Sequence, residues 1–200
     1  MKLITDFVPS RIQDSICNEL DKFDFPWYYE SYTVNINKSE KDFIITDKCK
    51  ESPQFKHVFY WEDKPSSSYW HIVNPVLGLF EQATGHVISK FGRIKANLML
   101  QNESFPEGFY NTPHIDVGRM DKNWYTLVYY IDDSDGDTVL FNEIADPWMP
   151  DRNQLTEAAR FTPKKGQAVL FESNRWHAST PPRNHIKRRV VNYVFQLRKS

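Results

Sequence analysis

Two residues with metal-binding side chains, His114 and Asp116, stand two positions apart within the stretch 109–141. Residues two apart on an extended strand point to the same side, so this spacing predicts that both side chains bind one ion. We expect the third ligand to be a histidine that the fold returns to the same point, and His177 follows the alternating stretch 167–171. Two imidazoles and one carboxylate on one side of an ion suit Fe(II) that keeps its other positions open.

The His-x-Asp pair is a weak signal by itself. The chain has 6 histidines and 26 acidic residues among 200, so a triplet of this kind arises about once by chance. The alternative interpretation is that His114 is a buried structural histidine hydrogen-bonded to Asp116, and His177 has the same alternative. His57, on a predicted strand at 55–61, is interpreted as structural or surface, and His185 as exposed.

The order of predicted elements indicates the fold class. Asn74, Pro75 and Gly85 bracket a helix over 75–84 as its cap, first residue and end, and Ser10 is a plausible cap for a helix with apolar residues at 12, 16, 20 and 23. After residue 86 short strands dominate, predicted at 86–91, 93–101, 125–131, 139–141, 167–172 and 189–197. Helices confined to the first half indicate an α+β chain built on an antiparallel jelly-roll sandwich.

Length and composition predict one intracellular domain. A chain of 200 residues is most simply a single domain, with helices and supporting strands over 1–92 and the jelly-roll core over 93–197. The formal charge of −1 gives no basic field for nucleic acid. Two cysteines without a CxxC spacing, no apolar leader and no membrane-length apolar run favour the cytoplasm.

Further motifs follow the His-x-Asp pair in a fixed order, and together they resemble the Fe(II)/2-oxoglutarate dioxygenases, particularly the prolyl 4-hydroxylase branch. In that family His-x-Asp is followed by a strand ending Tyr-Tyr-Leu-Asn, a Gly-containing turn, a distal His, and an Arg or Lys roughly ten residues later. The resemblance covers about 93–197, and the first 90 residues contain no motif of it. The matching segments here are His114–Ile115–Asp116, Tyr129–Tyr130–Ile131–Asp132, Gly136–Asp137–Thr138, His177 and Arg188/Arg189.

The resemblance implies Fe(II) held by His114, Asp116 and His177, with 2-oxoglutarate as cosubstrate and O₂ as oxidant. Such an enzyme hydroxylates a C–H bond and releases succinate and CO₂. The far carboxylate of 2-oxoglutarate requires a fixed arginine, because the planar guanidinium gives a bidentate pair.

Neighbours on a strand face opposite sides, so only one of Arg188 and Arg189 points inward. The family's register favours Arg189, with Val191, Tyr193 and Phe195; the other register has Arg188, Val190, Asn192 and Val194 inward. The resemblance also assigns the cosubstrate to Tyr130, with Thr126 and Val128 facing inward beside it, and to Thr138 on the turn. On 93–101 we expect Lys95, Asn97, Met99 and Gln101 inward, where Asn97 and Gln101 either bind cosubstrate or substrate or are structural amides with their hydrogen bonds satisfied.

The substrate and two other functions stay open. The branch favours a peptidyl proline, and a small molecule is the alternative. From other classes, the chain is a non-catalytic metal-binding jelly-roll module or a cupin-type hydrolase or isomerase, neither of which needs a cosubstrate arginine. The stretch 142–163 is long for a connection and contains three prolines, so it is predicted to be a substrate lid.

Overall fold

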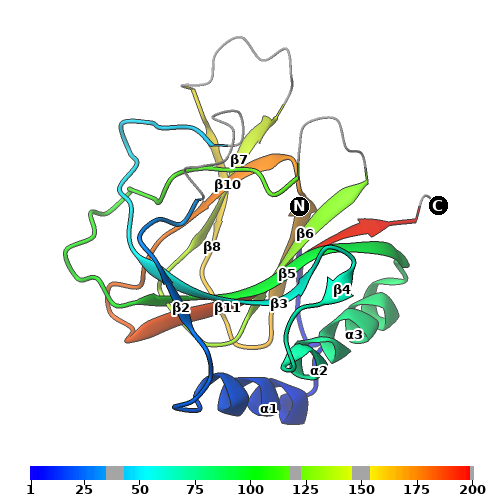
Figure 1. Ribbon diagram of the computed structural model, residues 1–200. Helices are drawn as coiled ribbons and strands as arrows, with labels where there is room; N and C mark the ends of the chain where they lie inside the picture. The colour runs from blue at the N-terminus through cyan, green and yellow to red at the C-terminus, as the bar shows by residue number, and fades with distance from the viewer. Residues whose placement is uncertain (35–42, 118–122, 146–153, 199–200) are drawn as a thin grey trace.

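A computed structural model describes residues 1–34, 43–117, 123–145 and 154–198, and its strands form two sheets that face each other (Figure 1). All strand pairs in both sheets are antiparallel, which is the jelly-roll arrangement expected from the sequence. The smaller sheet has the order β10 (Arg175–Ser179), β7 (Thr138–Ile144), β8 (Glu157–Phe161). The larger sheet has the order β1 (Lys2–Ile4), β9 (Ala168–Glu172), β6 (Trp124–Tyr130), β11 (Lys187–Leu197), β5 (Ile88–Leu100), β3 (Gln54–Trp61), β2 (Tyr28–Glu30), with β4 (Lys64–Pro65) beside β3.

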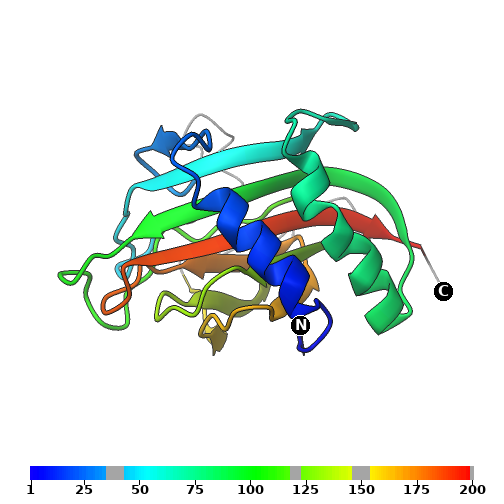
Figure 2. The ribbon, with the colours of Figure 1, turned by 90° about the horizontal axis from the view of Figure 1, so that it is seen from below.

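The described helices all come from the first half of the chain and cover one face of the larger sheet (Figure 2). They are α1 (Ser10–Leu20), α2 (Trp70–Val73) and α3 (Pro75–Thr84). Helix α3 confirms its local signals, because Pro75 is its first residue and Gly85 ends it in the left-handed region at φ 73°. The cap predicted for α1 is wrong: Pro9 is the N-cap, and no side chain caps the helix. None of the described helices is long and apolar enough to cross a membrane.

Strand β11 is buried on both faces. Val191, Tyr193 and Phe195 belong to the core beneath the helices, whereas Val190 belongs to the core between the two sheets. The side chains of strand β6 alternate in the same way, and Val128 and Tyr130 lie between the two sheets, as predicted. The interior of the jelly roll is therefore lined by alternate residues of the same strands that support the helices.

Several predicted boundaries are wrong. The two strands expected over 86–101 are the single strand β5, so the boundary drawn at residue 92 falls within a strand. Strand β3 pairs with β5, and the first 90 residues thereby extend the larger sheet. The predicted lid over 142–163 is also partly wrong, because β7 continues to Ile144 and pairs with β8. The middle of that stretch, 146–153, lies outside the described residues.

Candidate metal centre and adjoining cavities

The segment carrying His114 and Asp116 is extended but does not form a regular strand. His114 makes an isolated antiparallel bridge with His177 of β10, in which the two backbone N–H···O distances are 2.9 and 3.0 Å. The amide of Asp116 donates to the carbonyl of Ser173 at 2.9 Å. These backbone hydrogen bonds bring together residues that are more than fifty positions apart in the sequence.

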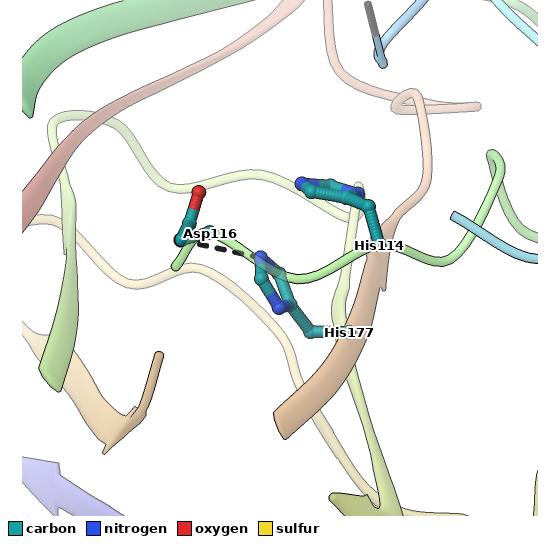
Figure 3. Close-up of side chains that lie close together, drawn as sticks. All are labelled: His114, Asp116 and His177. Atoms are coloured by element: carbon teal, nitrogen blue, oxygen red, sulfur yellow. Dashed lines mark ion pairs between the residues drawn. The ribbon is translucent and has the colours of Figure 1, made fainter. Parts of the chain in front are cut away.

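The three side chains predicted as metal ligands lie together (Figure 3). Their nearest candidate ligand atoms all lie within 4.8 Å of one another, and Nε2 of His177 is 3.5 Å from Oδ2 of Asp116. The Nδ1 atoms of His114 and His177 donate to the carbonyls of Thr112 and Arg175, at 3.2 and 3.0 Å. Each imidazole therefore keeps Nε2 free for an ion, and two imidazoles with one carboxylate fit a divalent transition metal.

Neighbouring groups hold Asp116 in its charged form. Burial raises the pKa of its carboxyl, but the nearby His177 and Arg93 outweigh that effect and lower the pKa. Arg93 donates to Oδ1 at 2.6 Å, and Thr126 donates to Oδ2 at 2.8 Å. Burial, together with the neighbouring His177, lowers the pKa of His114 to about 3. A carboxylate and neutral imidazoles are the protonation states that metal binding requires.

Arg188 faces the interior of the jelly roll and has no ion pair within the described residues. Its Nε donates to the carbonyl of Gly136 at 2.7 Å and its Nη2 to Oγ1 of Thr138 at 2.9 Å, while Nη1 makes no hydrogen bond to the described parts of the chain. The side chain is 3% exposed. A buried guanidinium without a carboxylate partner is costly unless an anion joins it. Arg188 lines a cavity of about 40 Å³ together with Asn97, Val128, Thr138, His177 and Asn192.

The orientation preferred for Arg189 is wrong. Its guanidinium forms a bidentate ion pair with Asp132, with both N···O distances at 2.8 Å, and lies 3.0 Å from Asp21 of the segment after α1. The large residues Tyr193 and Phe195, expected inward with it, pack beneath the helices because that face is also apolar. Arg188 is therefore the inward arginine.

Of the other residues predicted to bind the cosubstrate, some face the interior of the jelly roll and one does not. Asn97 lines the cavity of Arg188, and its Oδ1 is buried without a hydrogen bond in the described residues. The hydroxyl of Tyr130 is likewise buried and unpaired there, and burial raises the pKa of Tyr130 to about 12, so it stays protonated. Thr138 positions Arg188. The inward orientation of Gln101 is wrong, because Gln101 is exposed beyond β5 and donates to the carbonyl of Arg183 at 2.9 Å.

A second cavity of about 720 Å³ opens beside the metal-binding cluster and shares Lys95 and His114 with the smaller one. Much of its wall comes from residues 26–69. His57 lies in this wall with both ring nitrogens hydrogen-bonded, to the carbonyl of Pro26 and to Oγ of Ser67. That contact supports the structural interpretation of His57. Arg93 and the wall residues were missed because long-range strand pairing brings them to the cluster.

Comparisons with known proteins identify a family and several solved structures that are similar to this chain. Residues 99–196, about half of the chain, match the family model described as the 2OG-Fe(II) oxygenase superfamily. No curated protein matches the sequence. Among solved structures, the α-ketoglutarate-dependent epimerase SnoN from nogalamycin biosynthesis is similar with a TM-score of 0.60 and 10% identity, covering 97% of this chain and 77% of its own.

Two prolyl hydroxylases are similar as well. The prolyl-4-hydroxylase of Pseudomonas putida has a TM-score of 0.53 and 14% identity, covering 98% of this chain and 91% of its own. The enzyme of Trichoplax adhaerens, solved with a peptide of the hypoxia inducible factor oxygen degradation domain, has a TM-score of 0.55 and 14% identity, covering 98% and 83%. At these identities the solved structures show a shared double-stranded β-helix fold.

Proposed function

The chain belongs to the 2OG-Fe(II) oxygenase superfamily, and from this premise we propose that it hydroxylates a C–H bond of a substrate held in the 720 Å³ cavity. It is a dioxygenase that uses Fe(II), 2-oxoglutarate and O₂. The observation that carries the proposal is the juxtaposition, in contiguous cavities, of a His-Asp-His cluster with a buried arginine that has no ion pair in the described residues.

We assign the iron to Nε2 of His114, the carboxylate of Asp116 and Nε2 of His177. Bound Fe(II) supplies the redox chemistry that couples decarboxylation of 2-oxoglutarate to succinate and CO₂ with oxidation of the substrate. Thr126 and Arg93 fix the carboxylate of Asp116 through hydrogen bonds of 2.8 and 2.6 Å. Such supporting contacts orient ligands and tune metal affinity.

The far carboxylate of 2-oxoglutarate is assigned to Arg188, whose Nη1 has no acceptor among the described residues. Asn97 adds an amide to the smaller cavity, and the buried, protonated hydroxyl of Tyr130 belongs to the same interior face of the larger sheet. The carboxylate would supply the counter-charge that the buried guanidinium lacks. Because the two cavities share His114, a cosubstrate bound at Arg188 can extend toward the iron ligands.

Iron loading and turnover of 2-oxoglutarate test this assignment. Wild-type protein reconstituted with Fe(II) should hold one iron per chain and form succinate. His114→Ala or Asp116→Ala should lower both by at least about tenfold, because each removes a direct ligand. The control is His71→Ala, an exposed histidine of α2 whose loss leaves the site intact. Wild-type turnover by either ligand variant, with a circular dichroism spectrum matching wild type, would refute the assignment.

A peptidyl proline is a second candidate substrate, which the prolyl hydroxylase resemblance favours. One observation supports it: a further cavity of about 360 Å³ shares Trp61, Arg93 and Asp116 with the larger one, so space continues on both sides of Asp116. An extended peptide uses such a continuous groove. Incubation with proline-containing peptides, followed by mass spectrometry for addition of one oxygen atom, tests this candidate; unmodified peptides under conditions of succinate formation would remove it.

A further inference from the structure

The 720 Å³ cavity has one cation that the described protein does not neutralise. Its charged lining residues are Lys56, Arg93, Lys95, Glu30 and Asp116. Lys56 forms an ion pair with Glu30, and Arg93 forms one with Asp116 at 2.6 Å. Lys95 has neither an ion pair nor a hydrogen bond within the described residues. The cavity therefore offers an uncompensated positive group close to the metal-binding cluster.

Strand geometry directs Lys95 toward the cavities. Its neighbours on β5, Ile94 and Ala96, are both 0% exposed and belong to the core beneath the helices. Since successive side chains alternate across a sheet, Lys95 faces the opposite side, and it lines both the larger and the smaller cavity. Burial, together with the charge of Arg93, lowers the pKa of Lys95 to about 7. A partly buried ammonium without a partner in the described residues is unfavourable, and an anionic ligand would relieve that cost.

Aromatic side chains line part of the same cavity. Tyr28, Trp61 and Tyr69 line it beside His57. The ring of His57 stacks on Tyr28 with an interplanar angle of 22° and meets Tyr69 edge-on at 89°. Its two hydrogen bonds, of 2.9 and 2.8 Å, fix the orientation of the ring. A cavity of about 720 Å³ with an apolar wall and one charged group has the size and character of a site for a small organic molecule.

We propose that the prime substrate is a small organic acid whose carboxylate pairs with Lys95 and whose planar or apolar body packs against Tyr28, Trp61 and Tyr69. The inference rests on the proposed function and specifies its substrate class. A carboxylate fits better than a phosphate, which takes several donors. The hydroxyls of Ser66 and Ser67 in the same wall are already engaged, with the carbonyl of Val58 and with His57.

Matched acids and amides test the inference directly. The protein is loaded anaerobically with Fe(II) and saturating 2-oxoglutarate and titrated by calorimetry with benzoate and benzamide, 3-phenylpropionate and its amide, and indole-3-acetate and its amide. At least one acid should bind about tenfold or more tightly than its amide, because only the acid forms the charge-assisted pair. In Lys95→Met, affinity for that acid should fall to that of the amide, while affinity for the amide is unchanged.

The control variant is Lys165→Met, which removes one positive charge at an exposed pair with Asp14 away from the cavity. Acid affinity should change less than about twofold in this variant, because exposed charges are screened. The visible absorption band of the iron-bound 2-oxo acid is recorded in every sample. Its persistence in Lys95→Met, at wild-type affinity for 2-oxoglutarate, separates substrate binding from cosubstrate binding.

The inference is overturned if no acid binds more tightly than its amide, or if Lys95→Met keeps the preference for the acid. It is also overturned if Lys95→Met weakens 2-oxoglutarate instead, which would assign Lys95 to the cosubstrate. Tighter binding of a proline-containing peptide, insensitive to Lys95→Met, would favour the second candidate. Absence of the absorption band in wild-type protein would contradict the proposed function, whereas the acid-to-amide ratio still reports on Lys95.

Discussion

Strand β11 carries two adjacent arginines with opposite surroundings. Arg189, on the face beneath the helices, is 1% exposed and bound by two carboxylates, whereas Arg188, on the interior face, is 3% exposed and has no carboxylate partner in the described chain. On β6, Tyr130 also faces inward, and its hydroxyl has no hydrogen bond in the described residues. The helix-covered face neutralises its arginine within the protein, and the interior face leaves its arginine available to an anionic ligand. Substitutions on the helix-covered face of β11 should therefore change stability, whereas substitutions on its interior face should change cosubstrate binding.

The largest expected effect lies on the helix-covered face. Asp132→Asn should destabilise the protein by about 2–4 kcal/mol, because it leaves the buried guanidinium of Arg189 with only the half-exposed Asp21. Urea denaturation measures this change. The matched control Asp14→Asn breaks an exposed pair with Lys165 and should cost less than about 0.5 kcal/mol. Equal stabilities of the two variants would contradict the structural role given to Arg189.

Gly136 tests how closely the interior arginine is confined. A Cβ at this position would lie 2.7 Å from Cδ of Arg188 and 2.7 Å from the carbonyl oxygen of Thr180. Gly136→Ala should therefore cost about 1–3 kcal/mol of stability and weaken 2-oxoglutarate binding by displacing Arg188. Gly78→Ala is the control, since nothing lies within 4 Å of its added Cβ on α3, and it should be neutral or stabilise by up to about 1 kcal/mol. Unchanged cosubstrate affinity in Gly136→Ala would argue against the confinement.

The smallest expected effect concerns the hydrogen bond that orients Arg188. Thr138→Val keeps the shape of a side chain that is 2% exposed but removes the acceptor for Nη2. Affinity for 2-oxoglutarate should fall by about 1 kcal/mol, which is roughly fivefold. Thr162→Val, which removes a hydrogen bond to Asp137 on an exposed segment, should leave that affinity unchanged. Calorimetric titration of both variants makes the comparison.

The sequence predicted the fold class because its strand and turn signals are local and numerous. Helix α3 is the clearest case, since Pro75 and Gly85 mark its two ends, although the side chain of Asn74 does not cap it. The His-Asp spacing identified side chains that the structure brings together, although the segment is held by bridges to β10 and not by a regular strand. Local spacing was sufficient there because any extended backbone places alternate residues on one side.

The sequence could not predict which alternate residues of β11 face the interior of the jelly roll. Alternation identifies the inner face only when the other face is polar, and both faces of β11 are buried. Tyr193 and Phe195 suggested the inner face, but they pack against the helices instead. The inward orientation of Lys95 was predicted from alternation, whereas the contact of Arg93 with Asp116 was inaccessible to local reasoning, because it arises from the pairing of β5 with β3 and β11.

The most direct test compares Arg188→Met with Arg189→Met in Fe(II)-loaded protein titrated anaerobically with 2-oxoglutarate, following the absorption band of the bound oxo acid. Arg188→Met should bind 2-oxoglutarate on the order of a hundredfold more weakly and remain as stable as wild type, because it removes an unpaired buried charge. Arg189→Met should lose stability, because Asp132 remains without its partner, and bind 2-oxoglutarate within about threefold of wild type wherever it is folded. Wild-type affinity in Arg188→Met, or a hundredfold loss in folded Arg189→Met, would contradict the assignment of the interior face to the cosubstrate.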